Sequence, residues 1–184
     1  MINRKEALIL IKKYLRGNDN IIHSFATEAV LKEIAKLLNK DENLWGLSGL
    51  LHNLDYEFTD NNPEQRGTLS AQLLEDLLPN NAINAIKANN YLHTDYMPVS
   101  SLDKSLIAGV AVTDFIFDTS KSLTKKKISE LNFEILMDKF LDESFSSYNI
   151  RSKIKLCKDI GIEIPEFLKL SLNALKSISN NLNI

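Results

Sequence analysis

Apolar residues recur along nearly the whole chain at intervals of three and four, and this helical period limits what the chain can fold into. The spacing is clear before Gly17, where Ala7, Ile11 and Leu15 fall on one helical face. No convincing segment alternates apolar and polar residues in the way that is typical of a strand. The sequence therefore predicts an all-α protein in which residues 1–184 form a single compact domain of roughly eight or nine helices.

Capping residues, glycines and prolines divide this pattern into separate helices. Asn18 or Asp19 is expected to cap the second helix, which ends near Leu37, and Asp41 is expected to cap the third. The polar stretch over 55–66 contains Pro63 and is expected to be a loop. The other helices are expected over 42–53, from Thr68 or Ser70 to before Pro79, and over 81–92, 101–117, 128–141, 149–160 and 165–182.

The charge balance excludes several classes of partner. Lys and Arg number 22 against 24 Asp and Glu, a net charge of −2, which argues against nucleic acid or an anionic membrane as the main partner. The run over 125–127, three lysines, is expected in an exposed loop or helix end. No segment approaches the roughly 18 apolar residues of a membrane span. The lone Cys157 fits a reducing compartment, so a cytoplasmic protein is expected. The sequence leaves the oligomeric state open.

Two of the three histidines lie on expected helices that could face each other. His23 and His52 both have apolar neighbours in the sequence. Imidazoles from neighbouring helices can bind a divalent metal ion when carboxylates or water complete its coordination. A buried histidine can equally be a structural residue, so the spacing alone leaves both interpretations open.

The segment 49–57, Gly-Leu-Leu-His-Asn-Leu-Asp-Tyr-Glu, resembles the Gly-Leu-Leu-His-Asp-(Ile/Leu)-Asp-Tyr-Glu segment of the HD-domain superfamily. These proteins are all-α metal-dependent phosphohydrolases named for a His-Asp doublet. The likeness is strongest to the small single-domain HDIG-type proteins and runs from Asn3 to Phe167. It implies an HD-type helical fold. It also implies a metal site made by a first histidine, the doublet and a later aspartate, with further histidines between them.

The chain keeps the two histidines of this implied site and departs from the family at four other positions. His23 matches the first histidine, and His52 matches the doublet histidine. The departures fall at the doublet aspartate, at two later histidines and at the last aspartate: Asn53, Arg66, Asn89 and Val110. An amide is a poor metal ligand, a guanidinium has no free lone pair and valine has no donor. The resemblance thus implies a degenerate metal site.

Two residues lie one helical turn after positions at which the chain departs from the family. His93 follows Asn89 by four residues, and Asp114 follows Val110 by four. A turn displaces a side chain by about 5.4 Å, which exceeds the tolerance of a metal ligand unless both helices slide. Asp55, just after the doublet, is expected to shape the loop rather than to bind metal.

Arg66 has two possible roles. Its guanidinium could hold a phosphate or carboxylate in a bidentate contact and so replace the positive charge of a metal ion. Alternatively, Arg66 points to solvent or pairs with Asp55 or Glu57.

Three functions remain open from the sequence. The favoured one is an inactive HD-type protein with a lost or weakened metal site and no required cofactor. Such a protein would act as a binding or regulatory module for a small anion, such as a phosphate or nucleotide-like molecule. The second is an active phosphohydrolase acting on a phosphomonoester or nucleotide through His23, His52 and a Zn, Mn, Fe or Mg ion. The third is a protein-interaction subunit. We expect His23 and His52 to converge on a pocket lined by Asn53, Asn89 and Val110.

Overall fold

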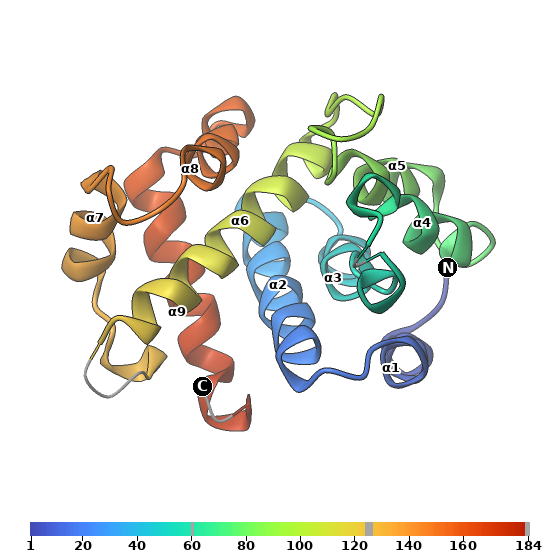
Figure 1. Cartoon of the computed structure of the whole chain (residues 1–184), viewed down its shortest axis with the longest axis horizontal. Helices are drawn as coiled ribbons and strands as arrows, with labels where there is room; N and C mark the ends of the chain where they lie inside the picture. Colours follow the sequence, from blue (N-terminus) through green and yellow to red (C-terminus); the bar gives the residue numbers. More distant parts are fainter. Residues whose placement is uncertain (60, 124–126, 183–184) are drawn as a thin grey trace.

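Nine α-helices and no strand form within residues 1–59, 61–123 and 127–182, which are the residues described by this computed structural model. They make one compact domain, so the all-α prediction is confirmed (Figure 1). The helices are α1 (Arg4–Tyr14), α2 (Asn18–Leu37), α3 (Glu42–Leu51), α4 (Thr68–Leu74), α5 (Asn80–Ala88), α6 (Ser101–Lys121), α7 (Phe133–Leu141), α8 (Tyr148–Ile154) and α9 (Ile164–Leu182).

Two long helices, α2 and α6, organise the others. α2 packs against α3, α6 and α9, and α6 also contacts α5 and α8. In Figure 1, α6 crosses the middle of the molecule, with α1, α3, α4 and α5 on one side and α7 and α8 on the other, while α9 passes behind it. Residues from α2 and α6 therefore meet near the centre of the fold.

Side-chain caps define several helix starts. The Asn3 side chain accepts hydrogen bonds at the start of α1, and Ser100 forms a capping box with Asp103 at the start of α6. Asp41 caps α3, as predicted, by accepting from the backbone N–H groups of Asn43 and Leu44. The second helix starts at Asn18 after Gly17, with no side-chain cap, so the predicted cap by Asn18 or Asp19 is wrong.

Several expected helices are shorter than the apolar pattern suggests. The helix expected over 128–141 is a 3₁₀ turn, Ile128–Glu130, followed by α7, because Asn132 accepts from the Ile135 N–H and starts a new helix there. The helix expected over 149–160 changes to a 3₁₀ helix, Lys155–Ile160, after α8. α4 ends at Leu74, and α5 ends at Ala88 instead of residue 92.

The loop expected over 55–66 contains two short 3₁₀ turns, Tyr56–Phe58 and Pro63–Gln65. Beyond α5, the Asn90 side chain donates to the Pro63 carbonyl at 2.7 Å and ties the end of that helix to this loop. Within the described ranges, no helix is long and apolar enough to cross a membrane. Of the lysine run, Lys127 is exposed, and residues 125 and 126 lie outside the described residues.

A close approach between α2 and α3 sets the centre of the fold. Gly49 lies on α3 against the α2 backbone, and a Cβ at this position would lie 2.8 Å from the Thr27 carbonyl oxygen and 3.1 Å from the Glu28 nitrogen. Backbone atoms cannot move aside as a flexible side chain can. The absence of a side chain at Gly49 therefore allows the two helices to lie this close.

Replacing Gly49 should test this contact. Gly49→Ala is expected to lower the free energy of unfolding by about 1–3 kcal/mol, because the added methyl group forces α3 away from α2. Gly46→Ala, one turn earlier, is the matched control, because its Cβ would meet only the flexible Lys32 side chain. Urea denaturation measures both variants, and an equal loss in the two would contradict the proposed close packing.

Candidate functional site

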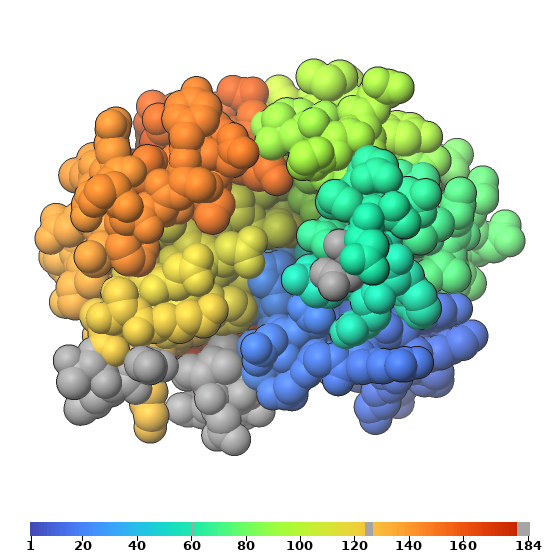
Figure 2. Space-filling model, in the orientation of Figure 1, coloured from blue at the N-terminus to red at the C-terminus, as the bar shows by residue number. Residues whose placement is uncertain are grey.

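A polar cavity of about 360 Å³ lies where α2, α6, the end of α5 and the segment after α3 meet. Figure 2 shows the molecule hollowed near the middle of the visible face, between these segments. Seven of the residues singled out from the sequence line it: His23, His52, Asn53, Arg66, Asn89, Val110 and Asp114. His93 is exposed and is not among the lining residues, and Asp55 is buried outside the cavity.

The two histidines face each other across α2 and the end of α3. Their ring centroids are 5.5 Å apart. His52 Nδ1 lies 2.8 Å from the Gly49 carbonyl oxygen, an acceptor only, so this nitrogen carries the proton and Nε2 keeps its lone pair. Burial, with a smaller contribution from the neighbouring His23, lowers the pKa of His52 to about 3. His52 is therefore neutral near pH 7.

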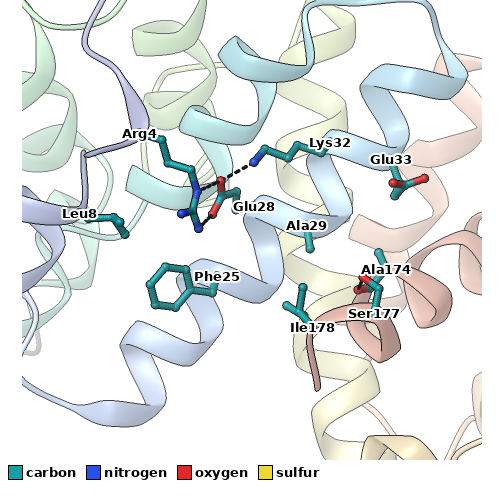
Figure 3. Close-up of a pocket in the computed structure, with 10 residues that line it drawn as sticks. All are labelled: Arg4, Leu8, Phe25, Glu28, Ala29, Lys32, Glu33, Ala174, Ser177 and Ile178. Carbon is teal, nitrogen blue, oxygen red and sulfur yellow. Dashed lines mark hydrogen bonds and ion pairs between the residues drawn. The ribbon is translucent and has the colours of Figure 1, made fainter. Parts of the chain in front are cut away.

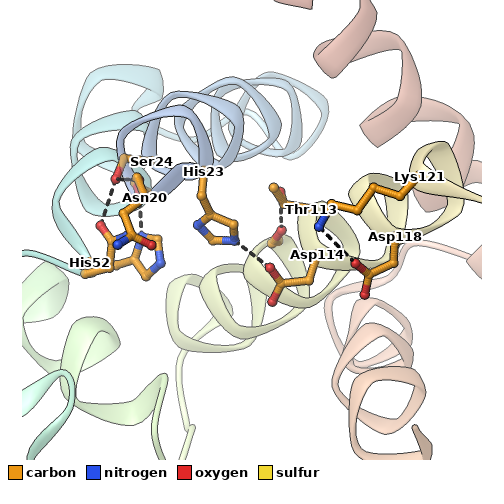
Figure 4. A network of polar contacts seen from close by, with 11 residues as sticks. Asn20, His23, Ser24, His52, Thr113, Asp114, Asp118 and Lys121 are labelled. Atoms are coloured by element: carbon orange, nitrogen blue, oxygen red, sulfur yellow. Dashed lines mark hydrogen bonds and ion pairs between the residues drawn. The ribbon is translucent and has the colours of Figure 1, made fainter. Parts of the chain in front are cut away.

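Asp114 brings a carboxylate to the histidine pair. Its Oδ1 lies 2.9 Å from His23 Nε2, although this nitrogen has no well-aligned hydrogen bond (Figure 4). Asp114 reaches His23 although it lies one turn after Val110 on α6, because helical side chains lean toward the N-terminus of their helix.

Asn53 belongs to a buried hydrogen-bond network. Its Oδ1 accepts from Ser24 Oγ at 2.8 Å, and the same hydroxyl lies 2.9 Å from the Asn20 carbonyl oxygen. Asn53 is only 6% exposed. Residue 53 is therefore neutral, and its amide oxygen is already engaged by a neighbour.

Asp55 shapes the loop that carries Arg66. Asp55 Oδ2 accepts from the backbone N–H groups of Gly67 at 2.7 Å and of Ser70 at 2.9 Å. Gly67 has φ of 82°, and a Cβ there would lie 2.7 Å from the Ile86 carbonyl oxygen. Both features need glycine, so the turn after Arg66 is held in one conformation.

Arg66 lines the cavity and forms no ion pair within the described residues. Its guanidinium stacks over the Tyr56 ring, 4.6 Å from the centroid, and Nε lies 3.4 Å from Thr59 Oγ1. Neither terminal nitrogen has a hydrogen-bond or ion-pair partner in the described part of the chain. Arg66 forms no hydrogen bond or ion pair with Asp55 or Glu57, so the alternative of pairing with these carboxylates is wrong.

The sequence analysis missed several lining residues. Asp19 and Asn20 precede His23 by one turn, and Phe117 and Lys121 follow Asp114 by one and two turns. This spacing of three or four residues was the available signal, since it places them on the same helix faces as His23 and Asp114. Tyr56, next to Asp55, also lines the cavity.

The donors present do not fit a metal centre. No group of three His, Cys, Asp or Glu side chains among the described residues is arranged to hold a metal ion. His23 and Asp114 contact each other, and Asn53 contacts Ser24. Without a third side chain directed at the same point, two imidazoles would leave most coordination positions to water.

Comparison of the chain with protein-family models, with curated proteins and with solved structures found no match.

The buried neutral His52 should make stability depend on pH. Its folded-state pKa of about 3 lies below the ordinary 6.5, so the unfolded chain binds a proton in this interval and the folded chain does not. Stability should therefore fall as the pH falls from 6.5 toward 3, by up to about 1.4 kcal/mol per pH unit from this group.

His52→Gln removes this proton difference and serves as the comparison. Urea unfolding at several pH values between 4 and 7 should give a steeper rise of stability with pH for the natural chain than for His52→Gln. Parallel slopes would show that His52 does not titrate differently on folding.

Proposed function

We propose that the protein is a binding module that takes a small anion into the cavity at His23 and His52, with Arg66 as the anion receptor and no metal ion required. The observation that carries this proposal is the partly buried guanidinium of Arg66, whose two terminal nitrogens have no partner among the residues that the structure describes. A guanidinium in this state can form a bidentate contact with a phosphate or carboxylate.

The other lining groups favour a ligand of low charge. Lys121 adds a second cation, whereas Asp19 and Asp114 add two carboxylates. A polyanion would place its further charges near these carboxylates at a Coulomb cost. Tyr56 and the Asn side chains offer a flat apolar face and hydrogen-bonding groups. Phosphate or a small phosphomonoester or carboxylate is therefore the proposed ligand class.

The resemblance to HD-domain proteins supports the same proposal. A change of four matched positions to neutral or cationic residues would remove the need for a dication, because no cluster of carboxylates remains to be neutralised. In this proposal the chain is an inactive HD-type homologue, and the cytoplasm, suggested by its single cysteine, is where it acts.

An active metal-dependent phosphohydrolase is the second candidate. The specific observation in its favour is Asp114, which supplies a carboxylate next to the retained histidine His23. Its weakness is that the described donors do not converge on a common point. Metal content separates the two candidates, as tested below.

Arg66 variants should test anion binding. At a constant ionic strength, inorganic phosphate is expected to raise the melting temperature of the natural chain, following RT ln(1 + [L]/Kd), which reaches about 2.7 kcal/mol at 100 times Kd. Arg66→Ala should abolish the shift, and Arg66→Lys should also lose most of it because an ammonium lacks the planar fork.

Arg16→Ala is the matched control, because Arg16 is exposed and lines no described cavity. It should keep the full phosphate response. A response that is the same in the natural chain and in Arg66→Ala would contradict the assignment of Arg66 as the receptor.

Restoring the family carboxylates should create metal affinity. The double variant Asn53→Asp, Val110→Asp is expected to bind Zn²⁺ or Mn²⁺ at least about tenfold more tightly than the natural chain, because two anionic ligands join the histidines. Calorimetric titration measures both proteins, and the apo double variant should be less stable because two negative charges are added to a partly buried cavity with no cation between them.

The metal content of the natural chain tests the second candidate, the active metal-dependent phosphohydrolase. Elemental analysis of protein purified without chelator should find far less than one metal ion per chain. Near-stoichiometric zinc, manganese or iron would favour the active hydrolase instead.

A further inference from the structure

A second cavity of about 470 Å³ lies between α1, α2 and α9 and shares no lining residue with the histidine site (Figure 3). Its size falls within the range of roughly 300–1,000 Å³ that is usual for small-molecule pockets. The walls combine charged and apolar side chains. The position of each kind indicates which class of molecule would fit.

One end of the cavity carries a buried carboxylate bound by two cations. Glu28 is only 4% exposed, and Arg4 contacts it through Nε at 2.6 Å and Nη2 at 2.8 Å. Lys32 Nζ lies 2.6 Å from Glu28 Oε1. Two positive charges on one negative charge leave this end with a net charge of +1.

These cations have hydrogen-bonding capacity to spare. The Arg4 side chain is half-exposed and its Nη1 has no partner among the described residues, while the Lys32 ammonium uses one of three protons on Glu28. Glu28 is fully engaged and cannot neutralise both. An anionic group at this end would gain from both the charge and the free N–H groups.

The rest of the cavity is mostly apolar. Phe25 lies under the Arg4 guanidinium, 5.8 Å from ring centroid to Cζ, and Ala29 continues this wall along α2. Ile178 faces them from α9. Glu33 lies on the side of the cavity away from Arg4 (Figure 3), so a second negative charge at the far end of a ligand would be repelled.

We propose that this cavity binds a monocarboxylate with an apolar chain. The carboxylate lies at Arg4 and Lys32, and the chain lies against Phe25, Ala29 and Ile178. The net positive charge selects the anionic head, the apolar walls select the chain, and Glu33 disfavours a dicarboxylate. This site is independent of the anion site at Arg66.

Calorimetric titration with sodium octanoate tests the site directly. We expect saturable binding to the natural chain, with acetate and octylammonium binding far more weakly because one lacks the chain and the other has the wrong charge. Lys32→Gln should weaken octanoate binding about tenfold by removing a charged hydrogen-bond donor. Ala29→Phe should fill the cavity and abolish binding, with circular dichroism confirming that each variant is folded.

Two controls make the result specific. Lys36→Gln makes the same change one turn further along α2, at an exposed residue outside the cavity, and should bind octanoate like the natural chain. Arg66→Ala should also leave octanoate binding unchanged, so the two proposed sites can fail separately. The proposal is overturned if octanoate does not bind, if octylammonium binds equally well, or if Lys32→Gln has the same affinity as the natural chain.

Discussion

The close approach of α2 and α3 is the constraint on which the candidate site depends. Gly49 allows it, because any Cβ at this position would meet the α2 backbone within 2.8 Å. His23 then projects from α2 toward His52, which lies one turn after Gly49, and the ring centroids come within 5.5 Å. The same Gly49 carbonyl holds the His52 ring at 2.8 Å. One glycine thus controls both the separation of the histidines and the tautomer of one of them.

The described part of the cavity contains charged side chains but no group of three His, Cys, Asp or Glu side chains arranged around a common point. Burial keeps His52 neutral by lowering its pKa, and Asp114 interacts with His23. Arg66 supplies a positive charge from a loop that Asp55 ties down through backbone N–H groups. A cation fixed in a polar cavity, with free donors and no carboxylate partner in the described residues, is suited to receive an anion. This arrangement is the physical basis for the proposed binding function.

Helical periodicity was sufficient to predict the fold class, because the apolar pattern is local and repeated. It did not predict the break before α7, where the cap at Asn132 overrides a continuous apolar pattern. In the site, Val110 and Arg66, both singled out from the sequence, line the same cavity, although the sequence left the role of Arg66 open. The contact between Asp114 and His23 was not predicted. Asp114 lies one turn after Val110, but its side chain leans back toward the N-terminus of α6 and so reaches His23. The stacking of Arg66 depends on tertiary contacts that no local pattern contains.

The central claim is that the cavity binds an anion through Arg66 without a metal ion. Nuclear magnetic resonance of ¹⁵N-labelled protein, kept in chelator and titrated with inorganic phosphate, tests it most directly. Anion binding through Arg66 predicts saturable shifts of the Arg66 Nε–H signal and of the His23 and His52 imidazole signals. It would be contradicted if these signals stayed unchanged in phosphate, or if they moved only after the chelator was removed and a divalent metal ion was added.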